Sequence, residues 1–422
     1  MPADGPGVQS QPARAWKAAV FPCYHAASPR PSRGQSREAQ RMTAPTHSGR
    51  LRRWAANAAA VLLGFLIVAI ALAAAEGALR LKARLSSDFP PPSLEQYGQG
   101  IIHGKSILSY ELTRDGTVRG VAKWGDQLIY SVSGRTDAAG RRLTPCTAAA
   151  GDDAPVAAFF GCSMTFGQGV QDDETLPARF CAHAPDWQAF NYGVGGYGPQ
   201  QMWLQICKNR VLKEFSGRRG VVVYSFIDHH LERLVGTPSV LSSWTYPLPW
   251  LEEDNGRIVH RGTFRDRSLA QDFYFRYVRR AHLTRFIENR LPSPKPAKER
   301  KDAALDFLVR LVVECKQAAR EQAPGFTFCC LVLPTCGGTA RGRLLQRLEG
   351  IGVRTLDYEH LFEEAGIPDS ELFFNDSPLG TKGHFKPQGY DLVAQRLSRD
   401  ISAGMNAPEA CAPGPPSSEA PQ

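Results

Sequence analysis

The stretch "FFGCSMTFGQGV", residues 159–170, changes from an apolar strand to a turn of small residues that carries a serine. An unbroken apolar run is typical of a strand that is covered on both faces, as in a parallel sheet. The small residues permit a tight passage from strand to helix, which can present the Ser163 hydroxyl to solvent. A serine at the start of a helix is, taken alone, most often a cap. The stretch by itself leaves open whether Ser163 is a nucleophile.

The same rhythm of apolar strand, loop and amphipathic helix continues along the chain. We predict strands at 156–161, 189–193, 221–226, 326–333 and 353–358. We predict helices at 199–214, 303–321 and 387–402. In the second helix Leu305, Leu308 and Cys315 fall on one face at three-to-four spacing. This alternation predicts an α/β fold with a doubly wound parallel sheet, whose ligands bind at the carboxyl ends of the strands.

Most of the positive charge lies at the amino terminus. Residues 1–53 hold nine Lys/Arg and two acidic residues, which is +7 of the net +9, so the remaining 369 of the 422 residues are nearly balanced at +2. A basic surface for nucleic acid is therefore not expected. We predict a disordered basic tail over 1–53 and a second disordered tail over 406–422.

An apolar run follows the basic tail. Residues 55–75 contain no charged residue in 21 positions, and as a helix they would be about 30 Å long, enough to cross a bilayer. Arginines precede the run and Glu76 follows it, which by the positive-inside rule keeps the amino terminus cytoplasmic. We predict a single membrane anchor over 54–80, with all later residues outside the cytoplasm. A cleaved signal peptide is the alternative, since "ALAAAEGA" offers small residues to a peptidase.

The rest of the chain divides by composition. We predict a stalk and a small β-rich lead-in over 81–150, and the main domain over 151–405. Within it, residues 231–300 form an insertion rich in aromatic residues and arginines, which we interpret as a cap over the active site. A surface that grips a sugar or nucleic-acid backbone is the alternative. The ten cysteines do not have zinc-site spacing, and we interpret most of them as reduced thiols in the core.

Two further loops follow predicted strands on the edge that carries Ser163. Residues 191–198 read Asn-Tyr-Gly-Val-Gly-Gly-Tyr-Gly, and these glycines allow backbone N–H groups to point at a common spot, as an oxyanion requires. Near the carboxyl terminus, His384 lies in a loop just before a helix that starts around Pro387. This position favours His384 as a general base.

These three loops, in this order, resemble the GDSL/SGNH hydrolase superfamily. The family's first block, Gly-Asp-Ser-x-Thr-x-Gly, is matched by residues 161–167, with Cys in place of Asp. The second block is an Asn followed five residues later by the oxyanion glycine, matched by Asn191 and Gly196. The last block places a glycine five residues after the histidine, as His384 and Gly389 do.

The resemblance covers residues 155–403 and implies a flavodoxin-like three-layer sandwich with a central parallel sheet, the SGNH hydrolase fold. The anchored arrangement is similar to membrane-tethered bacterial members, which implies a periplasmic catalytic domain in the bacterial envelope. The resemblance also implies that Ser163 is the nucleophile and His384 the base. The amides of Ser163 and Gly196 would hold the oxyanion, with Asn191 in the same oxyanion or substrate-binding group.

The chain departs from the family pattern at two positions. The family has an oxyanion asparagine after the third strand, where this sequence has His229; an imidazole N–H could take over that role, or His229 could position substrate. Three residues before His384 the family has an aspartate, whereas this sequence has Thr381. Asp376 is the nearest upstream carboxylate and completes a triad if the loop folds back; otherwise the site is a Ser-His dyad.

The resemblance implies a serine esterase or lipase-type hydrolase that acts on ester bonds, with O-acyl groups of an ester or acylated carbohydrate as substrate. Acyl transfer to an envelope polysaccharide is one alternative. A catalytically inactive glycan-binding or scaffold protein is another, because of the changes at His229 and Thr381. No cofactor and no metal are expected, since the successive residues Asp228, His229 and His230 rarely converge on one ion.

Overall fold

The computed structural model describes residues 47–85, 100–104, 106–124, 126–145, 150–241, 247–288, 290, 297–335, 340–376 and 382–405. The predicted tail 406–422 and most of the tail 1–53 lie outside these residues. The first helix, α1 (His47–Leu85), contains the stretch Leu51–Lys82, which is long and apolar enough to cross a membrane. Contacts divide the chain into two compact units, and α1 from Val68 onward belongs to the same unit as all later residues.

A five-stranded parallel sheet forms the centre of this second unit, in the order β11–β10–β7–β5–β6. The strands are β5 (Val156–Phe160), β6 (Gln188–Asn191), β7 (Arg219–Phe226), β10 (Gly325–Val332) and β11 (Arg354–Asp357). Numbered along the chain, this order is 2-1-3-4-5, the flavodoxin-like arrangement. The predicted α/β fold is confirmed. The strand order reverses between β5 and β7, which is where such folds bind their ligands.

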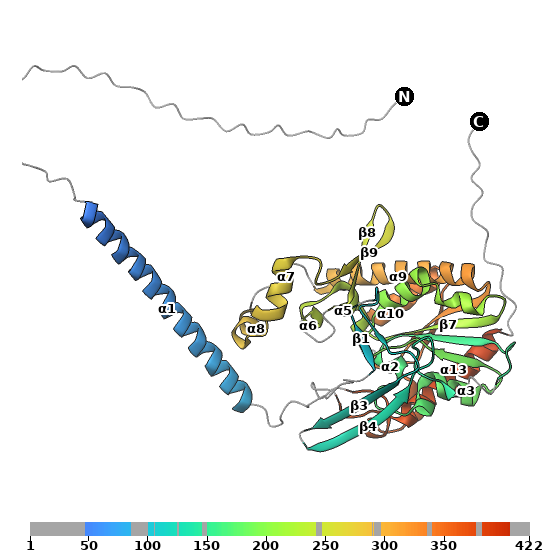
Figure 1. The fold of residues 1–422 in the computed structure, drawn as a ribbon. Coiled ribbons are helices and arrows are strands. Elements are labelled where there is room, and N and C mark those ends of the chain that lie inside the picture. Colours follow the sequence, from blue (N-terminus) through green and yellow to red (C-terminus); the bar gives the residue numbers. More distant parts are fainter. Residues whose placement is uncertain are drawn as a thin grey trace, which may run out of the picture. The chain divides into compact units, whose positions relative to one another are not determined.

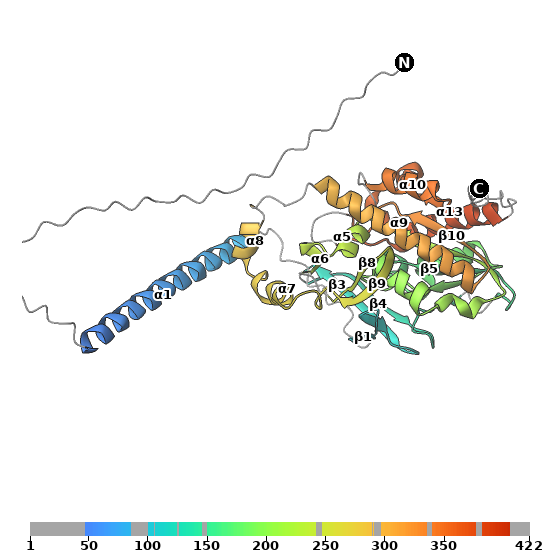
Figure 2. The same ribbon diagram turned by 90° about the horizontal axis from the view of Figure 1, so that it is seen from above.

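Helices cover both faces of the sheet (Figure 1). On one face α13 (Pro387–Met405) packs against α3 (Leu176–His183). On the other, α9 (Ala297–Gln322) packs against α4 (Pro199–Trp203), α5 (His229–Val235) and α10 (Ala340–Gly350). Figure 2 shows α9 lying across the strands with α10 beside it. These layers confirm the predicted three-layer sandwich.

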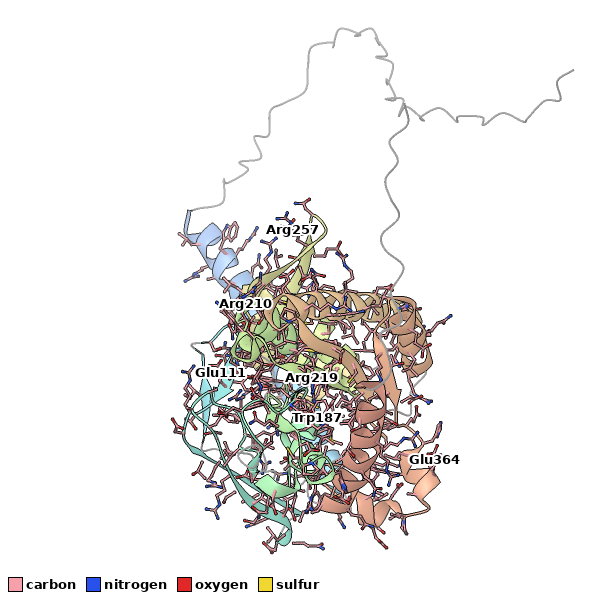
Figure 3. All side chains as sticks on the ribbon, turned by 90° about the vertical axis from the view of Figure 1, so that its right-hand side faces the viewer. Glu111, Trp187, Arg210, Arg219, Arg257 and Glu364 are labelled. Atoms are coloured by element: carbon pink, nitrogen blue, oxygen red, sulfur yellow. The ribbon has the colours of Figure 1, made fainter. Side chains whose placement is uncertain are left out.

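The core lies between these layers. Every residue of β5 is buried, and β7 is buried from its second residue to its end. On α9, Leu305, Leu308 and Cys315 are fully buried, as their spacing predicts. Charged side chains such as Arg257 and Glu364 point outward (Figure 3). Each fully buried aliphatic side chain stabilises the fold by about 1.5–3 kcal/mol.

The predicted helix over 199–214 is interrupted. Only α4 is α-helical; it continues into the π-helical turn η3 (Leu204–Lys208) and, after a break, the 3-10 helix η4 (Val211–Phe215). Within η3 the Asn209 N–H donates to the Leu204 carbonyl at 2.9 Å, which is one residue longer than an α-helical bond. Arg210 then adopts a positive φ of 53°, which an α-helix does not allow. This backbone conformation ends the helix.

The described part of the lead-in contains four strands and packs on the main domain. The strands are β1 (Ile101–His103), β2 (Tyr110–Leu112), β3 (Thr117–Trp124) and β4 (Gln127–Arg135), and they pair antiparallel as β1–β2 and β3–β4. Beyond β4, Arg142 pairs with Asn191, the last residue of the edge strand β6. The lead-in thereby covers backbone groups that the edge strand would otherwise leave unpaired.

The insertion begins within α5 and adds a hairpin and short helices. Its elements are α6 (Pro238–Leu241), β8 (Pro249–Asp254), β9 (Arg257–Thr263), α7 (Leu269–Phe273), the π-helical turn η5 (Tyr274–Val278) and α8 (His282–Glu288). The hairpin β8–β9 packs against α4, and Arg310 of α9 donates to the Gly256 carbonyl at 3.1 Å. A cap over the active site stays a prediction. The remaining elements are the 3-10 helix η2 (Asp172–Glu174), α2 (Ser163–Phe166), α11 (Leu361–Ala365) and α12 (Asp369–Leu372).

We expect Leu308→Ala to lower the free energy of unfolding by about 2–5 kcal/mol, because it removes a fully buried side chain between α9 and the sheet. Val313→Ala, on the exposed side of the same helix at 44% exposure, should change it by less than about 0.5 kcal/mol. Urea unfolding of the full chain in detergent measures both. Equal effects of the two substitutions would contradict the packing of α9.

Candidate active site

Ser163 lies where the strand order of the sheet reverses. It follows β5 by three residues and is the first residue of α2. Gly161 makes this turn possible, because a Cβ there would lie 2.2 Å from Thr165 Oγ1 and 3.2 Å from the Ser225 carbonyl oxygen. Ser163 is 7% exposed. The turn thus holds its hydroxyl in a nearly dry position at the carboxyl edge of the sheet.

A return of the backbone brings a carboxylate to His384. Phe373, just after α12, pairs antiparallel with Phe385, and the Phe374 N–H donates to the His384 carbonyl at 2.8 Å. This pairing places Asp376 beside the imidazole. Gly383 leaves room for it, because a Cβ there would lie 1.9 Å from Asp376 Oδ1.

The loop between the two, which includes Thr381, lies outside the described residues. The residues on either side of this loop are described. They are held together by the backbone pairing and by the contact between the carboxylate and the imidazole. The fold-back that a triad requires is therefore present in the structure.

A chain of hydrogen bonds joins the three side chains. His384 Nε2 lies 2.8 Å from Ser163 Oγ, and His384 Nδ1 lies 2.6 Å from Asp376 Oδ2. The His384 N–H also donates to Asp376 Oδ1 at 2.9 Å. The Asp376 side chain is 1% exposed and that of His384 is 21% exposed. The acid is therefore buried behind a ring that is itself partly exposed.

The carboxylate fixes the proton on the imidazole. Burial on its own would raise the pKa of Asp376, but the hydrogen bonds and the charge of His384 outweigh it and hold this pKa below its ordinary value. An ionised carboxylate only accepts hydrogen bonds, so Nδ1 of His384 must donate to it. The lone pair of a neutral ring is then on Nε2, which faces the Ser163 hydroxyl. This arrangement can remove a proton from the serine.

The glycine-rich loop after β6 packs directly on α2. Asn191 Nδ2 donates to the Thr165 carbonyl at 3.0 Å, and Asn191 Oδ1 accepts from the Gly193 N–H at 3.0 Å. A Cβ on Gly193 would lie 2.7 Å from the Phe166 nitrogen. Asn191 is 1% exposed, so its amide ties the two loops together inside the protein. These contacts do not bear on its predicted place in the oxyanion or substrate-binding group, which stays a prediction.

Gly196 lies at the turn of the same loop with a positive φ of 79°, a conformation that glycine adopts without a steric penalty. Tyr110 of the lead-in fixes this turn, because its hydroxyl donates to the Gly195 carbonyl at 3.0 Å and its carbonyl accepts from the Tyr197 hydroxyl at 2.6 Å. Among the residues that the structure describes, the N–H groups of Ser163 and Gly196 have no hydrogen-bond partner. They stay the predicted oxyanion donors.

His229 is not brought into this group by any described hydrogen bond. It is the first residue of α5, its side chain is 67% exposed, and its Nδ1 lies 3.5 Å from Glu232 Oε2. His230, the next residue, is fully buried and its Nδ1 lies 2.8 Å from the Tyr224 hydroxyl. The two histidines thus point to different environments. The predicted oxyanion or positioning role of His229 stays a prediction.

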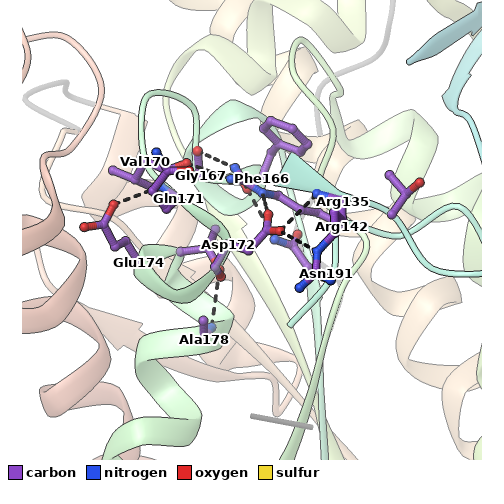
Figure 4. Close-up of polar contacts among 12 residues, drawn as sticks. Arg135, Arg142, Phe166, Gly167, Val170, Gln171, Asp172, Glu174, Ala178 and Asn191 are labelled. Atoms are coloured by element: carbon purple, nitrogen blue, oxygen red, sulfur yellow. Dashed lines mark hydrogen bonds and ion pairs between the residues drawn. The ribbon is translucent and has the colours of Figure 1, made fainter. Parts of the chain in front are cut away.

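Arg142 supports the turn that carries Ser163, and the sequence did not reveal it. Its guanidinium is 1% exposed, forms an ion pair with Asp172 Oδ1 at 2.9 Å, and donates to the carbonyls of Phe166, Gly167 and Val170 at 3.0, 2.6 and 2.7 Å (Figure 4). Because arginines are rarely buried, an arginine in the sequence is expected at the surface, and no local pattern indicated that Arg142 is buried. Gly383 was also missed, although a glycine directly before the histidine is a signal of close backbone approach.

The comparisons with known proteins find a likeness in structure only. No family model and no curated protein matches the chain. A lipolytic protein of the G-D-S-L family from Veillonella parvula is 13% identical, over 59% of this chain and 99% of that one, with a TM-score of 0.33. An extracellular lipase from Streptomyces rimosus is 12% identical over 58% and 99%, TM-score 0.33. An acetyl xylan esterase from the rumen bacterium Butyrivibrio proteoclasticus is 9% identical over 60% and 64%, TM-score 0.32.

Arg142→Met should lower the free energy of unfolding by about 3–5 kcal/mol, because it leaves Asp172 and three carbonyls without their buried partner. Arg135→Met is the matched control: its guanidinium lies 3.9 Å from the same Asp172 but is 69% exposed, so we expect a change of at most about 1 kcal/mol. Urea unfolding measures the free energy of unfolding of both variants. If Arg142→Met lowered it no more than Arg135→Met does, Arg142 would have no supporting role.

Proposed function

We propose that the protein is a serine esterase that hydrolyses carboxylic ester bonds, with O-acyl esters as its substrate class. One observation carries the proposal: the hydrogen-bonded chain from Asp376 through His384 to Ser163. A serine becomes a nucleophile when a base within hydrogen-bond reach takes its proton and a third group orients that base. The three side chains have this order and spacing, at the edge of the sheet where ligands bind.

In the proposed reaction, Ser163 Oγ attacks the ester carbonyl carbon while His384 Nε2 takes its proton. The resulting imidazolium is stabilised by Asp376 through Nδ1. The tetrahedral intermediate then expels the alcohol, which receives the proton from Nε2 and leaves an acyl-serine. Water, activated by the same nitrogen, attacks the acyl group; the carboxylic acid leaves and Ser163 regains its proton.

The negative charge of the intermediate requires hydrogen-bond donors that are in place before the reaction. We assign this role to the N–H groups of Ser163 and Gly196, which have no partner among the described residues. Each such donor typically lowers the barrier by about 2.7–4 kcal/mol. His229 is a further candidate donor if its side chain turns away from Glu232.

We further propose that α1 is an uncleaved anchor and that the catalytic domain lies outside the cytoplasm. The apolar stretch Leu51–Lys82 is long enough to span a bilayer, and Arg50, Arg52 and Arg53 lie within two residues of its start. Cys181 takes part in a disulfide bond, and disulfides persist mainly in oxidising compartments. Together these features support an exported, membrane-tethered enzyme.

Ser163→Ala should abolish labelling by a fluorophosphonate probe and lower kcat/KM for an aryl acetate by about 10⁴-fold or more, because no nucleophile remains. Ser225→Ala is the control, since Ser225 is a buried serine at the end of β7; labelling and hydrolysis should persist. If the parent protein neither reacts with the probe nor hydrolyses the ester, the proposal is refuted.

Gly383→Ala should lower kcat/KM by about 10²-fold, because the added methyl group would displace Asp376 from the imidazole, and a shift of this size misaligns the base. Gly342→Ala is the matched control, since a Cβ at Gly342 meets no atom within 4 Å. Steady-state hydrolysis of the same aryl acetate measures both. If the two variants are equally active, the carboxylate has no part in the reaction.

A further inference from the structure

The segment from Arg265 to Arg290 exposes an apolar stripe. Leu269, Phe273 and Tyr277 lie four residues apart on the continuous helix formed by α7 and η5, and they are 91%, 59% and 60% exposed. The rings of Phe273 and Tyr277 are 5.3 Å apart, so these two side chains form one apolar surface. On α8, Ile287 is a further exposed apolar residue at 48%. Exposed apolar side chains that gather in this way mark an interaction surface.

The same segment is strongly basic. Residues 265–290 contain seven arginines, two aspartates and one glutamate, a net charge of +4. Arg276 and Arg279 are paired with Asp272 and Glu288. Arg280 and Arg285 form no ion pair within the described part of the chain. An apolar stripe flanked by unpaired arginines is typical of a helix that lies in the interface of an anionic bilayer.

A contact within the second unit places this segment beside the end of the apolar helix. Glu76 of α1 accepts hydrogen bonds from the backbone N–H groups of His282 and Leu283 at 3.0 and 2.8 Å. Glu76 is also the first charged residue after the apolar run 55–75. If that run fills the hydrocarbon core, Glu76 lies at its boundary. Helix α8, whose first residue His282 comes four positions after the end of η5, then begins at the depth of the lipid headgroups.

We propose that residues 265–290, the interfacial segment, lie on the surface of the membrane that α1 crosses. Leu269, Phe273 and Tyr277 enter the outer edge of the acyl chains, and the unpaired arginines contact the phosphates of anionic phospholipids. Aromatic residues are enriched at this depth because their rings suit a boundary between water and hydrocarbon. The proposal rests on the proposed anchor and is independent of the proposed esterase chemistry.

The interfacial segment would fix the catalytic domain against the membrane. A single helix leaves a domain free to rotate about its linker, whereas a second attachment point restricts it. The substrates that reach Ser163 would then be those that lie at or near the membrane surface. A second copy of the chain could also cover an apolar stripe, and the experiment below distinguishes this occupant from lipid.

The test uses the full chain with a photoreactive benzoylphenylalanine, reconstituted in bilayers of equal parts phosphatidylcholine and phosphatidylglycerol. The residue replaces Phe273 or Tyr277 in the interfacial segment, Phe65 in the apolar run as a positive control, or Val313 on α9 as a control of similar exposure, 44%. Mass spectrometry detects lipid adducts after irradiation. We expect adducts at Phe273, Tyr277 and Phe65 and few at Val313.

Each other result overturns a defined part of the proposal. Adducts at Phe65 without adducts at Phe273 and Tyr277 would refute the interfacial segment and leave the anchor intact. No adducts at Phe65 would refute the anchor and the inference together. Cross-links between two copies through Phe273, in place of lipid adducts, would assign the stripe to a dimer. Thermal unfolding of each labelled chain confirms that it is folded, and none of these outcomes depends on ester hydrolysis.

A charge-reversal pair tests the role of the arginines. Arg280→Glu combined with Arg285→Glu should lower the adduct yield at Phe273 by roughly five-fold for each arginine in bilayers that contain phosphatidylglycerol. In pure phosphatidylcholine the yield should not change. The matched control is Arg257→Glu combined with Arg320→Glu, two exposed arginines outside the segment. Equal yields for the two double variants in the anionic bilayer would refute the contact with anionic lipid.

Discussion

The position of the turn that carries Ser163 depends on the buried guanidinium of Arg142. Arg142 comes from the segment after β4, and it donates to the carbonyl of the last residue of α2, to two carbonyls that follow α2, and to Asp172 in η2. A buried cation is tolerated only where its charge is paired and its N–H groups are satisfied. The lead-in, the end of α2 and η2 must therefore take their places together. The lead-in is in this sense part of the same folded domain as the sheet.

Glycines let the backbone segments of the site approach one another more closely than side chains would allow. A Cβ at Gly161, Gly193 or Gly383 would lie 2.2, 2.7 or 1.9 Å from a neighbouring atom. Each of these positions joins two pieces of chain: β5 to α2, the loop after β6 to α2, and Asp376 to the residues before α13. The sheet fixes the positions of the strand ends. The absence of a side chain at these glycines then allows the loops to lie as close together as they do.

The sequence predicted the sheet well because parallel strands buried on both faces leave unbroken apolar runs. The strands at 156–161 and 221–226 appear within two residues of their predicted ends. The site was less predictable. Ser163, His384 and Asp376 could be named because three loops together resemble a known family, whereas none of these residues is decisive alone. The contacts of Asn191 and the burial of Arg142 depend on segments that are distant in the sequence. The exposure of His229 likewise depends on where α5 begins, since one position along the helix separates it from the buried His230.

The identity of the acid shows why spacing is a weak guide to geometry. The family pattern places an acid three residues before the histidine, and the threonine at 381 was therefore a reason to expect an inactive relative. In the structure, the pairing of Phe373 with Phe385 sets the distance between the carboxylate and the imidazole. The number of residues in the intervening loop has little influence, because that loop only has to connect two points that the pairing already holds together. An acid eight residues upstream thereby lies against His384 at 2.6 Å, a contact that the family's spacing of three residues does not predict.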